Sequence, residues 1–137
     1  MGPILIVEDN HDNRTFIVTA VIKLGYEAIG VETAGGALAA LGLAPVPGTQ
    51  STTSGRVSHA AAAVLLDVNL PDIDGRELTR HIRAQGKAQL PIIAITAMAM
   101  AGDRESCLSA GMNDYLAKPI TIEMIREVLE RWVGDVT

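Results

Sequence analysis

Short runs of apolar residues recur along the chain, separated by segments with a different pattern. Two of these runs, Ile4–Val7 and Ala61–Leu66, contain no polar residue and end directly at acidic side chains. A run without polar alternation is typical of a strand buried on both faces, as in a parallel sheet. We therefore predict five strands, the second with a weaker signal, at Ile4–Val7, Tyr26–Val31, Ala61–Asp67, Pro91–Thr96 and Asp114–Ala117.

The segments that follow these strands are predicted to be helices. Asn10 to Asn13 can start the first helix by accepting hydrogen bonds from its first N–H groups, and Gly25 ends it. The other four are predicted at Ala34–Leu41, Gly75–Arg83 and Asp103–Ala110, and after the capping residue Thr121.

The helical spacing of three and four also predicts which side chains face the core. These are Phe16, Ile17, Ala20, Val21 and Leu24 in the first helix, Leu78 and Ile82 in the third, and Ile122, Ile125, Leu129 and Trp132 in the last. Three arginines of the third helix, Arg76, Arg80 and Arg83, are expected to be solvated.

Five strands that alternate with five helices predict an α/β fold. Such alternation joins parallel strands by right-handed helical crossovers, so that helices cover both faces of the sheet. The predicted architecture is a flavodoxin-like, doubly wound (βα)5 domain whose five-stranded parallel sheet has the order 2-1-3-4-5. A length of 137 residues suits one domain over residues 1–137.

One segment interrupts this regular alternation. Ten of the 14 residues from Pro45 to Ser58 are Pro, Gly, Ser or Thr, and they have no apolar periodicity. A connection of this length is unusual inside a compact domain. We therefore predict a flexible surface insertion at about residues 43–60, between the second helix and the third strand.

The composition limits the classes of function. The formal net charge is −5 and the basic residues form no cluster, which argues against direct nucleic-acid binding. Cys107 is the only cysteine, so neither an intramolecular disulfide nor a thiolate metal cluster is expected. The N-terminus lacks the pattern of a signal peptide, and no apolar run is long enough to cross a bilayer. We therefore expect no membrane insertion in this chain and a cytoplasmic location.

Chemically active side chains follow four of the five predicted strands: Glu8 and Asp9, Asp67, Thr96 and Lys118. The carboxyl ends of parallel strands meet at one edge of the sheet, where such folds bind ligands. Three carboxylates brought together repel one another unless a cation joins them, and Mg²⁺ prefers such oxygen ligands. With a lysine and a hydroxyl, this set can hold phosphoryl oxygens, and an aspartate can itself attack phosphorus. Asp67 is the central candidate.

These residues lie in motifs that give the sequence a resemblance to a known family. It resembles a receiver (response-regulator, chemotaxis-regulator-like) domain of two-component signalling over essentially its whole length. The matching motifs are Val7 to Asn10 with Asn13-Arg14, Leu66 to Gly75, Ile95 to Ala97, and Lys118-Pro119. Each motif is weak alone, but their order, each at a strand end, is specific. The segment from Pro91 to Ile120 is most similar to receivers of hybrid histidine kinases.

The resemblance implies a phosphoacceptor with a bound metal ion. Asp67 would accept a phosphoryl group from a phosphohistidine, supplied by a histidine kinase or a histidine-phosphotransfer domain. Mg²⁺, with Mn²⁺ as a possible substitute, would be bound by Asp9, Asp67 and the backbone carbonyl of Asn69. Glu8 would act through a metal-bound water, and it departs from the aspartate pair that is most common in the family.

The resemblance also implies a conformational switch. Thr96 and Lys118 would contact the phosphoryl oxygens, and Tyr115 would turn inward when Thr96 moves. Met98 and Met100 belong either to the surface that changes on phosphorylation or to ordinary packing. Phosphorylation would then alter protein–protein contacts.

Two other functions remain open at this point. The chain could be a pseudo-receiver, an interaction module that is never phosphorylated. It could also be a phosphohydrolase with an aspartyl-phosphate intermediate, similar to haloacid-dehalogenase-like enzymes. Those enzymes carry a second aspartate two residues after the nucleophile, where this chain has Asn69. The sequence predicts neither the cognate kinase nor the oligomeric state.

Overall fold

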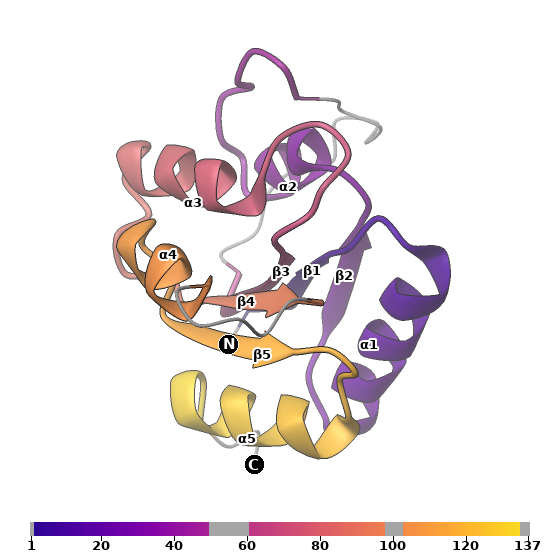
Figure 1. Cartoon of the computed structure of the whole chain (residues 1–137). Coiled ribbons are helices and arrows are strands. Elements are labelled where there is room, and N and C mark those ends of the chain that lie inside the picture. Colours follow the sequence, from indigo (N-terminus) through magenta and orange to yellow (C-terminus); the bar gives the residue numbers. More distant parts are fainter. Residues whose placement is uncertain (1, 50–60, 98–102, 135–137) are drawn as a thin grey trace.

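The computed structural model describes residues 2–49, 61–97 and 103–134 (Figure 1). Strands and helices alternate through the chain, as the apolar pattern predicts. Their bounds are β1 Ile4–Val7, α1 His11–Lys23, β2 Ala28–Val31, α2 Ala34–Ala40, β3 Ala63–Asp67, α3 Gly75–Ala84, β4 Ile92–Thr96, α4 Asp103–Ser109, β5 Asp114–Ala117 and α5 Ile122–Trp132.

The strands form one parallel sheet in the order β2-β1-β3-β4-β5. This confirms the predicted doubly wound fold and its strand order. Three strands begin one or two residues later than predicted, at Ala28, Ala63 and Ile92. The β1 and β3 strands are adjacent, with Val7 opposite Leu66, so the residues that follow them leave the sheet side by side.

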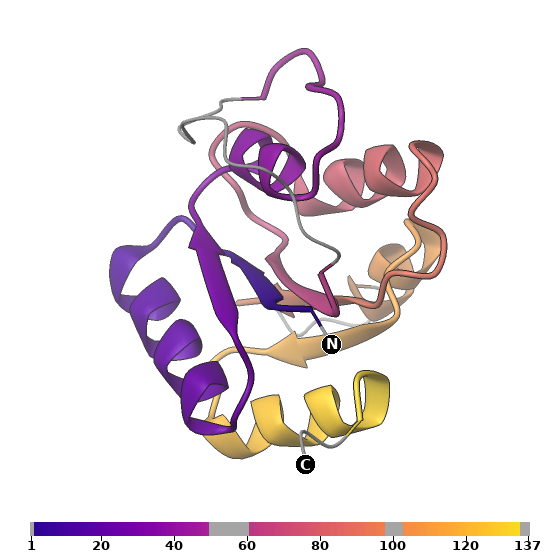
Figure 2. The ribbon, with the colours of Figure 1, turned by 180° about the vertical axis from the view of Figure 1, so that it is seen from behind.

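Helices cover both faces of the sheet (Figures 1 and 2). The α2, α3 and α4 helices pack on one face, around a core that includes Leu38, Leu78 and Cys107. The α1 and α5 helices pack on the other face, around Ile17, Ile125 and further aliphatic side chains. The buried position of Cys107 agrees with its predicted place inside a helix.

Helix ends follow the predicted capping residues. The side chain of Asn10 accepts a hydrogen bond from the N–H of Asn13, and Thr121 accepts one from Met124. Gly25 adopts a φ of 100° directly after α1, a conformation that glycine adopts without steric cost. These local signals set where α1 and α5 begin and where α1 ends.

Three predicted core residues are exposed instead. Phe16 is 45 % exposed, and Ile122 and Trp132 also lie at the surface. In α1, Phe16 and Ile17 are adjacent and therefore about 100° apart around the helix, so only Ile17 reaches the sheet. In α5, Val128 is buried beside Ile125 and Leu129.

The prediction that Arg83 is solvated is also wrong. Its guanidinium donates hydrogen bonds to the main-chain carbonyls of Lys87, Leu90 and Gly111, and to the side chain of Asn113. Lys87 and Leu90 precede β4, and Gly111 and Asn113 precede β5, so Arg83 binds carbonyls of the segments that lead into these two strands. Arg76 is only partly exposed as well, and it contacts Asp74 and Ser106.

The first part of the predicted insertion is described, and it contains neither helix nor strand over residues 43–49. Leu43 and Val46 nevertheless pack against the α2–α3 side of the core. The side chain of Gln85, at the end of α3, pairs with both the N–H and the carbonyl of Ala44. Residues 50–60 lie outside the described residues, as do Met98 and Met100.

Candidate functional site

Three carboxylates gather at the carboxyl edge of the sheet. Glu8 and Asp9 directly follow β1, and Asp67 is the last residue of the neighbouring strand β3. Each offers an oxygen within 4.8 Å of those of the other two. Glu8 and Asp67 are buried, whereas Asp9 is exposed. The structure therefore brings together the three acids that the sequence indicates.

Lys118 completes this cluster from the end of β5. Its Nζ atom lies 3.1 Å from Oε1 of Glu8 and 3.6 Å from Oδ2 of Asp67. The backbone N–H of Lys118 donates to the carbonyl of Thr96, which ties the end of β5 to that of β4. The peptide bond between Lys118 and Pro119 is cis. Lys118 thus faces two buried carboxylates.

The protonation of the cluster is uneven. Burial, together with hydrogen bonding to Glu8 and the negative charge of that residue, raises the pKa of Asp67 to about 7. Burial also acts on Glu8, but the neighbouring Asp67 carboxyl, the Asn10 N–H and the positive charge of Lys118 outweigh it and lower the pKa of Glu8. Burial and the neighbouring Glu8 raise the pKa of Asp9. Near neutral pH, Glu8 is therefore ionised while Asp67 is close to its titration midpoint.

The donor set fits a hard divalent cation. It consists of carboxylate oxygens, which are the preferred ligands of Mg²⁺ and Mn²⁺. Among the described residues, Oε1 of Glu8 is buried with no hydrogen-bond donor in suitable geometry, although Nζ of Lys118 lies nearby. A metal ion with its bound water would relieve both the repulsion among the acids and this unsatisfied oxygen.

The loop between β3 and α3 forms the other wall of the site. Residues 68–74 of this loop and Asp9 line a cavity of about 260 Å³. The N–H of Asn69 donates to Oδ1 of Asp67, while its side chain is exposed. A Cβ atom at Gly75 would lie 2.6 Å from the carbonyl oxygen of Asp67, so only glycine allows the loop to return this closely. The metal-binding role of the Asn69 carbonyl stays a prediction.

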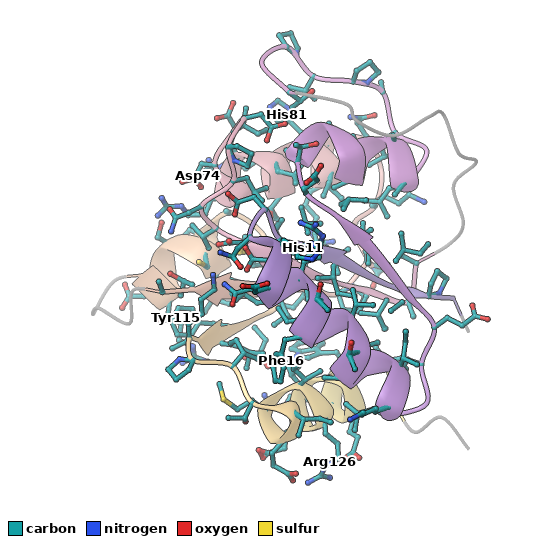
Figure 3. All side chains as sticks on the ribbon, turned by 90° about the vertical axis from the view of Figure 1, so that its right-hand side faces the viewer. His11, Phe16, Asp74, His81, Tyr115 and Arg126 are labelled. Atoms are coloured by element: carbon teal, nitrogen blue, oxygen red, sulfur yellow. The ribbon has the colours of Figure 1, made fainter. Side chains whose placement is uncertain are left out.

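The two predicted switch residues lie on β4, the strand next to β3, and on β5, one strand further out. Thr96 ends β4 and is 4 % exposed, next to the strand that carries Asp67. Tyr115 lies on β5 opposite Ala94, half-buried against the α2–α4 side of the core (Figure 3). Both positions suit the predicted roles, but the roles themselves stay predictions.

Sequence reasoning missed an apolar cavity next to Lys118. Its volume is about 530 Å³, and it is lined by Asn13, Phe16, Ile17, Lys118, Pro119 and Ile120. Phe16 projects into this region from α1, on the side that faces α5 (Figure 3). The signal was present in the sequence, since two neighbouring residues of one helix, Phe16 and Ile17, cannot both face the same sheet.

Sequence reasoning also gave no role to Arg14. Its Nη1 atom donates to the backbone carbonyls of Glu8, at 2.9 Å, and of Asp9, at 3.3 Å. A cation in the first turn of a helix is opposed by the helix dipole, at a cost of about 0.3–1 kcal/mol. An arginine at this unfavourable position was the available signal.

Comparisons with known proteins show which family the chain is similar to. The family model for the response regulator receiver domain matches residues 4–130. The sensor protein GacS of Pseudomonas syringae pv. syringae is 36 % identical over 135 residues, which cover 96 % of this chain and 13 % of that protein. The response regulator DivK of Brucella anthropi is 32 % identical, with 96 % of both chains covered.

A solved structure adds a third comparison. It is the receiver domain of the sensor histidine kinase PA1611 from Pseudomonas aeruginosa, with a magnesium ion coordinated in its active-site cleft. It is 42 % identical, has a TM-score of 0.75, and the match covers 98 % of this chain and 100 % of that domain. The chain thus spans about an eighth of the sensor protein GacS and nearly all of the response regulator DivK. Within the described residues, no helix is long and apolar enough to cross a membrane.

Proposed function

Because the chain belongs to the response regulator receiver domain family, we propose that it is a phosphoacceptor in a two-component phosphorelay. Asp67 accepts a phosphoryl group from a phosphohistidine, and the phosphorylated domain then changes its protein–protein contacts. The observation that carries this proposal is the convergence of Glu8, Asp9 and Asp67 within 4.8 Å, with Lys118 against two of them. It goes beyond family membership, because a degenerate receiver would lack part of this set.

The transfer follows from the position of Asp67. One of its carboxylate oxygens forms a bond to phosphorus while the bond from phosphorus to the histidine nitrogen breaks. The electron pair of that bond stays on the imidazole, which takes a proton from solvent. Asp67 must be ionised to attack, and its pKa of about 7 means that a modest rise in pH or a nearby cation is enough.

The remaining residues hold the reacting groups. Lys118 and the Thr96 hydroxyl donate hydrogen bonds to the phosphoryl oxygens. Asp9, Asp67 and the carbonyl of Asn69 would hold Mg²⁺, with Glu8 reaching it through water. When bound, the ion offsets the charge of the phosphoryl oxygens and of the acids.

The switch is proposed to run through Thr96 and Tyr115. The new phosphoryl charge draws the Thr96 hydroxyl toward Asp67, which vacates space behind it, and Tyr115 turns into that space. The surface formed by β4, α4 and β5 then changes its population of conformations. Thr96→Ala should retain phosphorylation at a reduced rate but lose the accompanying change in near-ultraviolet circular dichroism.

The proposed partner is a histidine kinase or a histidine-phosphotransfer domain. It must bring its phosphohistidine to the carboxyl edge of the sheet, and the apolar cavity beside Lys118 borders that edge. Phe16 is 45 % exposed there, so a partner with an apolar helix face would bury it on docking. The low share of the matched sensor protein that this chain covers suggests that the donor can lie in the same polypeptide.

Acetyl phosphate with Mg²⁺ provides the direct test, because it phosphorylates without a partner. Intact-protein mass spectrometry should show the addition of one phosphoryl group, which should disappear without Mg²⁺ and in Asp67→Asn. Asp12→Asn is the matched control, since Asp12 lies in the exposed first turn of α1. Absence of the mass shift together with absence of Mg²⁺ binding would favour the pseudo-receiver. Multiple turnover of a simple phosphoester would favour the phosphohydrolase.

A further inference from the structure

Arg14 holds the main chain of the two residues that carry the first two acids. Its Nη1 atom donates to the carbonyl of Glu8 at 2.9 Å and to that of Asp9 at 3.3 Å. Because Arg14 itself sits in the first turn of α1, these bonds fold the β1–α1 connection back onto the helix that follows it. The orientation of both acidic side chains therefore depends on a guanidinium that does not belong to the acid cluster.

The Arg14 side chain is itself held from three directions. Its Nη2 atom lies 3.3 Å from Nδ1 of His11 on the same helix, and Nη1 lies 3.8 Å from a carboxylate oxygen of Glu32, just after β2. Its stem crosses β2 at Gly30, where a Cβ atom would lie 3.3 Å from both Cγ and Cδ of Arg14. The same Cβ would lie 3.1 Å from Cγ2 of Val18. The absence of a side chain at Gly30 thus leaves the space that the arginine stem occupies.

This arrangement matters most while the acids carry charge. Glu8 and Asp67 are buried close together, and repulsion between them favours any movement that separates their carboxylates. Lys118, which lies between Glu8 and Asp67, and the Asn10 N–H bound to Glu8 oppose such a movement at the side chains. The two bonds from Arg14 oppose it at the main chain, because the β1–α1 connection can shift only by breaking them.

We propose that Arg14 is a positioning residue that fixes Glu8 and Asp9 for metal binding by holding their backbone carbonyls across a gap left open by Gly30. This proposal rests on the proposed function, since it assigns a role toward the metal site. Arg14 touches neither the phosphoryl group nor the metal. Its removal should therefore weaken metal binding and leave the chemical step of the fully loaded protein almost unchanged.

The test is Mg²⁺ titration by isothermal calorimetry on the wild type and on Arg14→Met, which keeps the apolar stem and removes the guanidinium. Loss of a group that orients metal ligands typically weakens metal affinity by about tenfold or more, and we expect about tenfold here. In acetyl phosphate reactions, the half-saturating Mg²⁺ concentration should rise by the same factor, while the rate at saturating Mg²⁺ stays within about twofold. Arg14→Lys, which can reach one carbonyl, should restore part of the affinity.

Two further variants test whether the position of the Arg14 guanidinium matters and whether loss of another arginine has the same effect. Gly30→Ala keeps the charge of Arg14 but displaces its stem, and it should weaken Mg²⁺ binding in the same direction. Arg126→Met is the matched control, because Arg126 is exposed on α5 and pairs with glutamates of its own helix. It should bind Mg²⁺ as the wild type does. Hydrogen exchange of the Asn10 amide, which donates to Glu8, should accelerate in metal-free Arg14→Met and not in the control.

The outcomes distinguish this inference from the proposed function. If the wild type binds no Mg²⁺, the proposed metal site is wrong. If the wild type binds Mg²⁺ and folded Arg14→Met binds it equally well, the positioning role alone is overturned. A fall in the rate at saturating Mg²⁺ without a change in affinity would also overturn it, because Arg14 would then act on the chemical step.

Discussion

At each edge of the sheet an arginine donates hydrogen bonds to main-chain carbonyls, but the groups around the two arginines differ. At the carboxyl edge, Arg14 donates to two main-chain carbonyls beside three carboxylates and a lysine. At the amino edge, Arg83 donates to the carbonyls of Lys87, Leu90 and Gly111 and to Asn113, and it forms no ion pair among the described residues. The Asn113 side chain in turn accepts from the N–H of Ile92 at the start of β4.

The difference shows how one fold separates stability from chemistry. At the amino edge the side chains of Arg83 and Asn113 bind each other and main-chain groups, and this network holds β4, β5 and α3 together. At the carboxyl edge three carboxylates lie beside Lys118, and the pKa of Asp67 is raised to about 7. That imbalance of charge costs stability in the absence of a metal, and it is also what makes the site able to bind a cation and a phosphoryl group.

The largest expected effect is at the amino edge. Arg83→Met leaves several main-chain carbonyls without their donor, and burial of such groups costs about 1–3 kcal/mol each when water cannot replace the donor. Because Arg83 is only partly buried, we expect a total loss of about 2–4 kcal/mol in the free energy of unfolding. Urea denaturation measures it. Mg²⁺ affinity of the folded variant should not change, and a large loss of affinity would contradict the separation of the two edges.

Removing the charge of Asp67 at the carboxyl edge should raise the free energy of unfolding, whereas the Arg83 variant lowers it. Folding raises the pKa of Asp67 from its ordinary 3.8 to about 7, so the stability linked to its protonation is complete only below about pH 4 and is lost progressively up to about pH 7. Asp67→Asn should therefore stabilise the metal-free protein at pH 8, by about 1–3 kcal/mol, and should bring little gain at about pH 4. Thermal unfolding in the presence of a chelator tests this. Equal stabilisation at both pH values would mean that charge repulsion is not its cause.

The carboxyl edge was the more predictable of the two from sequence. Parallel strands end at one edge, so Asp9, Asp67 and Lys118 could be assigned to one site once the strands were found. Local patterns also predicted where α1 and α5 begin, through Asn10 and Thr121. None of these inferences needed knowledge of a specific contact between distant side chains.

The amino edge was not predictable in this way. Arg83 bonds to Gly111, 28 residues away, and three of its partners are main-chain carbonyls, which every residue type provides. Periodicity likewise gives the direction of a helix face but not its width, which is why Phe16 and Trp132 were wrongly assigned to the core. Whether Glu8 or Asp67 has the higher pKa depends on how deeply each carboxylate is buried, and the sequence does not give that depth.

The pH dependence of Mg²⁺ affinity tests whether Asp67 titrates near neutral pH. Mg²⁺ must displace the proton of Asp67, whose pKa of about 7 in the metal-free protein results mainly from burial and then from Glu8. Affinity should therefore rise about tenfold per pH unit below neutrality and level off above it. Calorimetric titrations between pH 5.5 and pH 8.5 (about the range in which an acid of this pKa titrates) measure this slope. A flat profile would mean that Asp67 is ionised throughout.

The smallest expected effect comes from Gln85, the exposed neighbour of the Arg83 network. Its side chain forms two hydrogen bonds with the backbone of Ala44, in the described start of the 43–60 segment. Water can replace exposed bonds of this kind, so Gln85→Ala should cost only about 0.5 kcal/mol of unfolding free energy. The amide of Ala44 should exchange faster, and the affinity for Mg²⁺ should not change. Arg83 and Gln85 lie on one helix end and both bind backbone groups, so their variants compare a partly buried, charged set of bonds with an exposed, neutral one. If Gln85→Ala proved as destabilising as Arg83→Met, the two bonds to Ala44 would stabilise the fold as strongly as the Arg83 network does, and the contrast between partly buried and exposed bonds would be wrong.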